Sequence, residues 1–178
     1  DYVNKKNGPL LRERKDLKKQ IKALEEQEER SAEDEAKLSD LREQLQAAEA
    51  KPLFKPILGC EVYCARRSRF KKDANVPNPY RPNQSVDNSG WHLVLLAKDL
   101  TGYKNLIKMV SRSWIDGYYY RPRIDKELLE AHHEGIIASS ACLGGEIPQH
   151  IMYGNIDEAE KSIEWFKGIF GDDFYLEL

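Results

Sequence analysis

The stretch from Leu10 to Ala48 limits the possible folds more than any other part of the sequence. It contains no proline, glycine or aromatic residue, and nearly every position is a strong helix former. Its apolar residues recur three or four positions apart, which is the spacing of an amphipathic seam. They are Leu17, Ile21, Leu24, Leu38, Leu41, Leu45 and Ala48. The pattern predicts helix along most of this stretch.

The seam is interrupted between Leu24 and Leu38, so we expect two helices and not one. The interruption, EQEERSAEDEAK, contains Ser31 followed three residues later by Asp34, which is typical of a capping box that starts a new helix. We predict an antiparallel helical hairpin, with helices at about residues 10–29 and 32–49. Two roles remain open for it: a solvated insertion, the commoner use of charged helices, or an arm whose basic face touches a partner or a phosphate backbone.

Length, charge and cysteine content limit the class of protein. The chain has 178 residues, enough for one ordinary domain with a real core, and its 28 basic and 30 acidic side chains leave a net charge of −2. No apolar run approaches the roughly 18 residues of a membrane-spanning helix. The sequence has three cysteines, Cys60, Cys64 and Cys142, an odd number without the paired spacing of a zinc finger. No hydrophobic signal segment opens the sequence. These features favour a reduced, cytoplasmic location.

From Lys51 onward, short apolar strands alternate with amphipathic helices. The expected strands are PILGCEVYC, WHLVLLAK, GIIASSA and DFYLEL. One expected helix, TGYKNLIKMVSRSWIDG, starts at a threonine cap, and a second is IDEAEKSIEWFKGIFG. The first should present one apolar face, made of Tyr103, Leu106, Ile107, Val110 and Trp114. This alternation predicts parallel strands in an α/β sheet or barrel, with the chemistry at the C-terminal ends of the strands.

The segment between the first two strands is polar, basic and without periodicity, and we expect a mobile loop there. Its sequence is RRSRFKKDANVPNPYRPNQSVDNSG. Contact with a phosphate backbone is conceivable for such a segment, but solvation is the commoner role of its charges.

Three residues at or near the strands are candidate metal ligands. We expect Glu61 at the end of the first strand, where an ionised carboxylate among apolar neighbours needs a cation or hydrogen bonds to offset its desolvation. His92 lies in the second strand and Cys142 follows the third, and imidazole and thiolate both bind zinc-like metals. A lone histidine in a strand, such as His92, is more often a hydrogen-bonded core residue. A lone cysteine such as Cys142 is more often a small buried hydrophobe. The other histidines are expected to be exposed: His132, His133 and His150.

Five blocks, in order, carry a resemblance to a known family: ILGCEVY, HLVLLAKDLTGYKNLIKMVS, GYYYRPRID, EGIIASSACLGGEIPQ and GDDFYLEL. They resemble the amino-terminal PHP (polymerase and histidinol phosphatase) domain of the bacterial DNA polymerase III alpha subunit. The resemblance covers residues 51–178 as the central part of that domain, and the opening residues 1–9 are similar to the end of a helix that precedes it. Residues 10–50 interrupt the family pattern and are expected to be an insertion that forms the helical hairpin.

The resemblance implies a distorted (βα)7 barrel with a metal cluster at the strand ends. Glu61 then matches the family's glutamate ligand, His92 its strand histidine, and Cys142 a position that supplies a ligand in some members. In members with a full ligand set, zinc or manganese supports 3′–5′ exonuclease or other phosphoesterase activity, whereas in others the domain only supports the polymerase. DNA-directed DNA synthesis, a nucleotidyl transfer, would belong to the parent chain, whose implied partners are DNA and the replisome subunits.

Parts of the family pattern have no counterpart in this sequence: the amino-terminal HxH strand, the histidine block after it and the carboxy-terminal DxH strand. We therefore expect an incomplete barrel, a fragment that by itself binds divalent metal weakly or not at all and hydrolyses nothing. Open sheet edges or the hairpin could pair with another copy. The alternative is a free-standing PHP-family phosphoesterase such as a histidinol phosphatase. It is less favoured because GYYYRPRID and SACLGGEIP resemble the polymerase branch.

Overall fold

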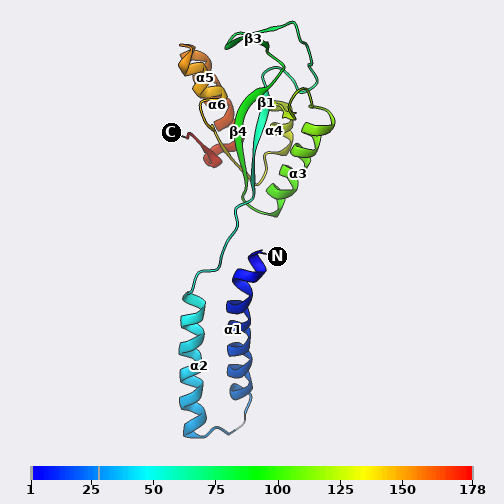
Figure 1. Cartoon of the computed structure of the whole chain (residues 1–178). Helices are drawn as coiled ribbons and strands as arrows, with labels where there is room; N and C mark the ends of the chain where they lie inside the picture. Colours follow the sequence, from blue (N-terminus) through cyan, green and yellow to red (C-terminus); the bar gives the residue numbers. More distant parts are fainter. Residues whose placement is uncertain (1, 28, 178) are drawn as a thin grey trace. The chain divides into compact units, whose positions relative to one another are not determined.

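The computed structural model describes residues 2–27 and 29–177, and the chain divides into two compact units, Asp1–Pro56 and Ile57–Leu178 (Figure 1). In the first unit, helices α1 (Tyr2–Glu25) and α2 (Ala32–Ala50) pack side by side and run in opposite directions. The predicted seam forms their buried core, which consists of Leu17, Ile21, Leu24, Leu38, Leu41 and Ala48. The predicted capping box at the start of α2 is confirmed, because Ser31 and Asp34 hydrogen-bond reciprocally.

The segment after α2 belongs to the helical unit. Asn7 exchanges two hydrogen bonds of 2.8 Å with the backbone of Phe54, and the ring of Tyr2 meets that of Phe54 edge-on at 5.4 Å. Arg14 donates to the carbonyls of Ala48 and Lys51, which satisfies groups that the end of α2 would leave unpaired. The unit therefore ends at Pro56 and not at residue 50, and α1 runs without a break through the expected boundary after residue 9.

The second unit is built on a five-stranded sheet in the order β5-β1-β4-β6-β7. The strands are β1 (Gly59–Ala65), β4 (Gly90–Ala97), β5 (Arg123–Ile124), β6 (Ile136–Ser139) and β7 (Phe174–Tyr175). β1 pairs parallel with β5, and β6 with β7, whereas β4 is antiparallel to both β1 and β6. The expectation of parallel pairing is therefore wrong for β4. The segment that joins β1 to β4 contains no helix, so the chain returns antiparallel as in a hairpin.

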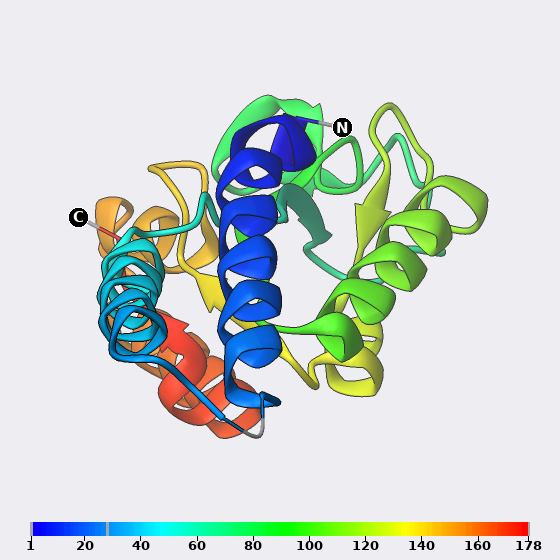
Figure 2. The same cartoon turned by 90° about the horizontal axis from the view of Figure 1, so that it is seen from below.

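Burial alternates along the central strands and defines two faces of the sheet. Val62, Cys64, Leu93 and Leu95 are buried, whereas the residues between them point to the other, more exposed face. Side chains of α3 (Leu100–Ile115), α4 (Lys126–His132), α5 (Glu146–Met152) and α6 (Ile156–Phe170) complete the core on the buried side. On that one side, α3 lies toward the β5 edge of the sheet and α6 toward the β7 edge (Figures 1 and 2). A short 3-10 helix, η1 (Gly171–Asp173), leads into β7.

Helix α3 turns only part of the predicted apolar face to the core, since Leu106 is buried and Val110 packs against the core cluster. Its buried residues are Gly102, Asn105, Leu106, Met109 and Ser113, while Tyr103, Ile107 and Trp114 are exposed. The reason is a close backbone approach: a Cβ added at Gly102 would lie 1.8 Å from the carbonyl oxygen of Gly135. Asn105 also donates to the carbonyl of Glu134 at 3.0 Å. The cap is Asp99 and not Thr101, because the Asp99 carboxylate accepts from Gly102 N.

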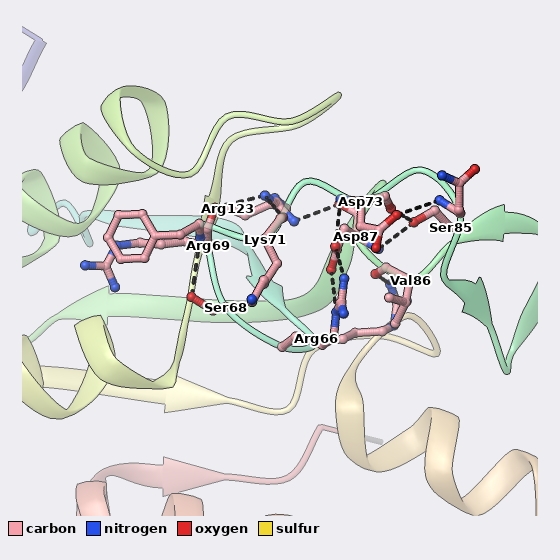
Figure 3. A network of polar contacts seen from close by, with 12 residues as sticks. Arg66, Ser68, Arg69, Lys71, Asp73, Ser85, Val86, Asp87 and Arg123 are labelled. Carbon is pink, nitrogen blue, oxygen red and sulfur yellow. Dashed lines mark hydrogen bonds and ion pairs between the residues drawn. The ribbon is translucent and has the colours of Figure 1, made fainter.

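The expected mobile loop between β1 and β4 is instead an ordered segment with a buried polar network (Figure 3). It contains β2 (Pro77–Asn78) and β3 (Arg81–Ser85), which pair antiparallel. The fully buried Arg123 donates to the backbone carbonyls of Gly117, Asp87, Arg69 and Lys71. The buried Asp87 carboxylate accepts from the Arg67 guanidinium and from Asp73 N. These hydrogen bonds hold the segment in place, because buried charges must be paired to offset their desolvation.

No helix in the described part of the chain combines the length and the hydropathy that crossing a membrane requires.

Candidate metal centre and the pocket beside it

The structure brings the three candidate ligands together. His92 Nδ1 lies 2.9 Å from a carboxylate oxygen of Glu61 and 3.4 Å from Cys142 Sγ, and the three donor atoms all lie within 4.8 Å of one another. The register of β1 and β4 explains the first contact. Tyr63 is the direct partner of His92, and Glu61, two residues earlier, projects from the same face of the sheet.

Glu61 differs from its expected setting in two respects. It is the third residue of β1 and not its last, and its side chain is 57% exposed to solvent. The Glu61 carboxylate is therefore not desolvated in the way that the sequence analysis expected. Its claim to be a ligand rests on its closeness to His92 on the face of the sheet opposite the core helices α3 to α6.

Cys142 reaches the centre through a tight loop after β6. Ala141 adopts a positive φ of 57°, and Gly145 N donates to the carbonyl of Cys142 at 2.8 Å. Gly144 accepts from His92 N at 3.0 Å and donates its own N–H to Cys142 Sγ at 3.4 Å. A Cβ at Gly144 would lie only 2.9 Å from His92 Nδ1. Glycine at this position therefore lets the loop approach the histidine ring closely enough for sulfur and nitrogen to meet.

Two neighbours of His92 were not singled out from the sequence. The Tyr63 ring meets the imidazole edge-on, with centroids 5.1 Å apart. Glu146 is buried, and its Oε1 accepts from Lys126 at 2.8 Å and from Ser162 at 3.0 Å. Glu146 and His92 both line a cavity of about 10 Å³. The available sequence signal was an acidic residue directly after two glycines, in one of the blocks that resemble the family.

The remaining histidines lie outside the centre. His133 is exposed as expected and His132 is half-buried, but His150 is buried, so its expected exposure is wrong. His150 Nδ1 lies 2.8 Å from the hydroxyl of Tyr80, whose ring packs against Trp91 and Tyr153 at 5.2 and 5.0 Å. The Tyr153 hydroxyl donates to the Tyr80 carbonyl at 2.7 Å. This aromatic cluster fixes the turn between β2 and β3.

A polar pocket of about 270 Å³ adjoins His92. Tyr63 and Gly144, which contact the imidazole, also form part of its wall. Further wall residues are Arg81 from the start of β3, and Tyr120 and Arg121 from the segment before β5. The candidate centre therefore opens onto a space large enough for a small polar ligand.

The donor set fits a divalent metal of borderline softness. One imidazole nitrogen, one carboxylate oxygen and one sulfur are the ligands that zinc prefers, and three protein ligands leave an open position for a substrate. Ligand atoms about 2.0 to 2.3 Å from one ion lie roughly 3.5 Å apart in tetrahedral geometry. The contacts of 2.9 and 3.4 Å at His92 are close to that spacing. The residues present therefore suit a metal with small adjustments of exposed side chains.

Comparison with known proteins identifies the class. Residues 15–178 match the family model described as PHP domain, and the chain belongs to this family. Curated relatives named DNA polymerase III subunit alpha match 70% of the chain. They are 48% identical over 125 residues in Borreliella burgdorferi, 46% over 128 in Aquifex aeolicus and 44% over 124 in Thermus aquaticus. The resemblance seen in the sequence is thereby confirmed. The chain spans about 10% of the length of these relatives.

Proposed function

We propose that this chain is the central part of the PHP domain of a replicative DNA polymerase III alpha subunit, and that Glu61, His92 and Cys142 form part of a divalent metal centre acting on phosphoesters. The observation that carries the proposal is the convergence of three donor atoms, from β1, β4 and the loop after β6, within 4.8 Å. The relatives named DNA polymerase III subunit alpha support the parent assignment.

The arrangement of the second unit fits an incomplete (βα)7 barrel. Four of its strands run in one direction, helices cover one face of the sheet, and the candidate ligands lie on the other face. In a closed barrel, the face with the candidate ligands would line the interior. The α1–α2 hairpin is proposed to be an insertion that interrupts the domain.

The chain's own residues would position a phosphoester beside the centre. His92 offers Nδ1 from a ring held by Tyr63, Cys142 offers a sulfur that already accepts an N–H, and the exposed Glu61 carboxylate is free to adjust its position. Zinc or manganese bound here would supply Lewis-acid polarisation of a phosphoryl oxygen, as in metal-dependent 3′–5′ exonucleases. Three ligands hold one ion at most, so we expect the isolated chain to bind metal weakly and to hydrolyse nothing.

A supporting role without catalysis is the second candidate. Glu61 and His92 lie 2.9 Å apart and can pair with each other without a metal, which favours a remnant site in a domain that only carries the polymerase. In either role the parent would work in the cytoplasm, with DNA and replisome subunits as its partners. Self-association through open sheet edges or the hairpin remains a separate proposal.

The two candidates are separated by metal analysis and a 3′-end removal assay on the full-length parent. We would compare the wild type with Glu61→Ala and His92→Ala, and use Glu164→Ala, an exposed position on α6, as the matched control. The proposed activity requires that metal and nuclease activity are present in the wild type and the control, and that both fall together in the other two variants. A wild type with neither metal nor nuclease activity would instead establish the supporting role.

A further inference from the structure

Two arginine residues line the pocket beside His92. Arg81 and Arg121 line it, and no aspartate or glutamate is among the described residues of its wall. Within the described part of the chain, neither guanidinium forms an ion pair or a hydrogen bond, although Arg121 lies 5.9 Å from the Tyr63 ring centroid. Two arginines in the wall of one pocket, without an acidic partner in that wall, are suited to bind an anion with several oxygens.

Both arginines are presented by well-defined backbone. Arg81 directly follows Tyr80, which the aromatic cluster of Trp91, His150 and Tyr153 holds in place. Arg121 lies two residues before the buried Arg123, whose side chain is anchored by the network of Figure 3. The anion site is therefore largely formed in advance.

The third notable wall residue is Tyr120. Its backbone has a positive φ of 57°, a conformation that non-glycine residues rarely adopt, and its side chain is 65% exposed. Strained backbone of this kind concentrates at ligand-binding positions. The ring of Tyr119 meets it edge-on at 4.8 Å and limits its motion. An exposed, oriented phenol ring beside two arginines is suited to stack on a nucleobase.

We propose that this pocket binds one terminal nucleotide of a DNA strand, with Arg81 and Arg121 on the phosphate oxygens and Tyr120 against the base. The volume of about 270 Å³ is near the lower end for small-ligand sites, about 300 Å³, and suits a single nucleotide. The inference rests on the proposed function because His92 belongs to both sites. Binding in the pocket, however, does not require the metal.

The test uses the metal-free 178-residue chain in chelator, with dAMP and inorganic phosphate as separate probes followed by calorimetry and NMR titration. We expect Arg81→Gln and Arg121→Gln each to weaken binding of both probes about tenfold, the effect of losing one charge-assisted hydrogen bond. Tyr120→Ala should weaken dAMP only. Arg112→Gln, which removes an exposed arginine on α3 outside the pocket, is the matched control and should bind like the wild type.

Three results would overturn the proposal: no saturable phosphate binding by the wild type, an equal loss in Arg112→Gln, or equal loss of dAMP and phosphate binding in Tyr120→Ala. Circular dichroism of each variant establishes that the fold is retained. If dAMP binds but the parent holds no metal, the metal-dependent function fails and the nucleotide pocket stands.

Discussion

Cys64 and Cys142 show how local position decides what a cysteine can do. Cys64 projects from β1 into the core and is 1% exposed, whereas Cys142 lies exposed in the loop beside His92. Burial raises the pKa of the Cys64 thiol far above its usual range. The pKa of Cys60 is also raised, by partial burial and then by the charge of Glu61. Since the thiolate is the reactive form, accessibility and charge predict very different reactivities.

Alkylation of the native chain by iodoacetamide at pH 8 should therefore modify Cys142 first, Cys60 more slowly and Cys64 only after unfolding. Peptide mass spectrometry over time gives the three rates. Added zinc should slow the reaction at Cys142 alone if that sulfur is a ligand. Modification of Cys64 in the native chain at the rate of Cys142 would contradict the burial described for β1.

Asp87 links the stability of the second unit to pH. Burial acts to raise the pKa of Asp87, but the hydrogen bonds from Arg67 and from the Asp73 backbone outweigh it and hold the pKa below its usual value. A depressed pKa adds stability above the unfolded value of about 3.9, and this stability is lost as the pH falls through the folded value.

Asp87→Asn should lower the free energy of unfolding at pH 7 by about 3 kcal/mol, because it leaves the Arg67 charge and the loop without their buried partner. The variant should also lose less stability than the wild type below about pH 4. Urea unfolding at a series of pH values measures both effects. The exposed Asp172→Asn is the control, and if its curve matched that of Asp87→Asn, the buried network would not be the cause.

At the scale of elements, the position of α3 depends on a glycine contact as well as on its buried apolar residues. The backbones of Gly102 and Gly135 meet so closely that no side chain fits between them. This contact sets the rotation of the helix and leaves Tyr103, Ile107 and Trp114 on the surface.

Gly102→Ala should destabilise the second unit by about 2 to 3 kcal/mol, even though alanine is the better helix former. Gly168→Ala on α6 is the matched comparison. No atom lies within 4 Å of a Cβ added there, so we expect unchanged or up to about 1 kcal/mol greater stability. Thermal and urea unfolding of both variants provides the measurement. Equal effects of the two substitutions would show that backbone contact does not position α3.

Sequence reasoning succeeded where a periodic pattern or a local motif carries the information. The hairpin seam, the Ser31 cap and the main strands are of this kind. It failed for the direction of β4, which depends on a connection without a helix, and for part of the face of α3, which depends on two glycines far apart in the chain. It also missed the order in residues 66–89, because buried ion pairs leave no periodic signal.

At the scale of the whole molecule, the two units have separate cores. One core consists of the leucine-rich seam of α1 and α2, and the other lies between the sheet and its helices. All three tryptophans, Trp91, Trp114 and Trp165, lie in the second unit. Tryptophan fluorescence therefore reports on this unit alone.

Deletion of residues 1–56 should leave the tryptophan-monitored unfolding transition at the same temperature and with the same cooperativity, because a separate core makes a unit independently stable. Thermal unfolding followed by fluorescence compares the two chains. The Leu38→Ala substitution in the full chain should lower the helical signal by circular dichroism without moving the fluorescence transition. A fluorescence transition that shifts with either change would show that the units fold together.

The candidate ligands could be named from the sequence, whereas the pocket beside them could not. Glutamate, histidine and cysteine are common metal ligands, and each candidate lies in or follows a strand that the sequence predicts. Arg81 and Arg121 belong to segments in which arginines usually serve solubility. Only the turn held by Tyr80 and the bend at Tyr120 bring them to one space.

The fixation of Tyr80 has a kinetic consequence. Because its ring and carbonyl are held by Trp91, His150 and Tyr153, the turn that carries Arg81 loses its conformational entropy when the domain folds and not when a ligand arrives. An anion that reaches Arg81 meets a wall already in place, so association needs no ordering step. Its rate is set by diffusion and by the ionic strength of the solution.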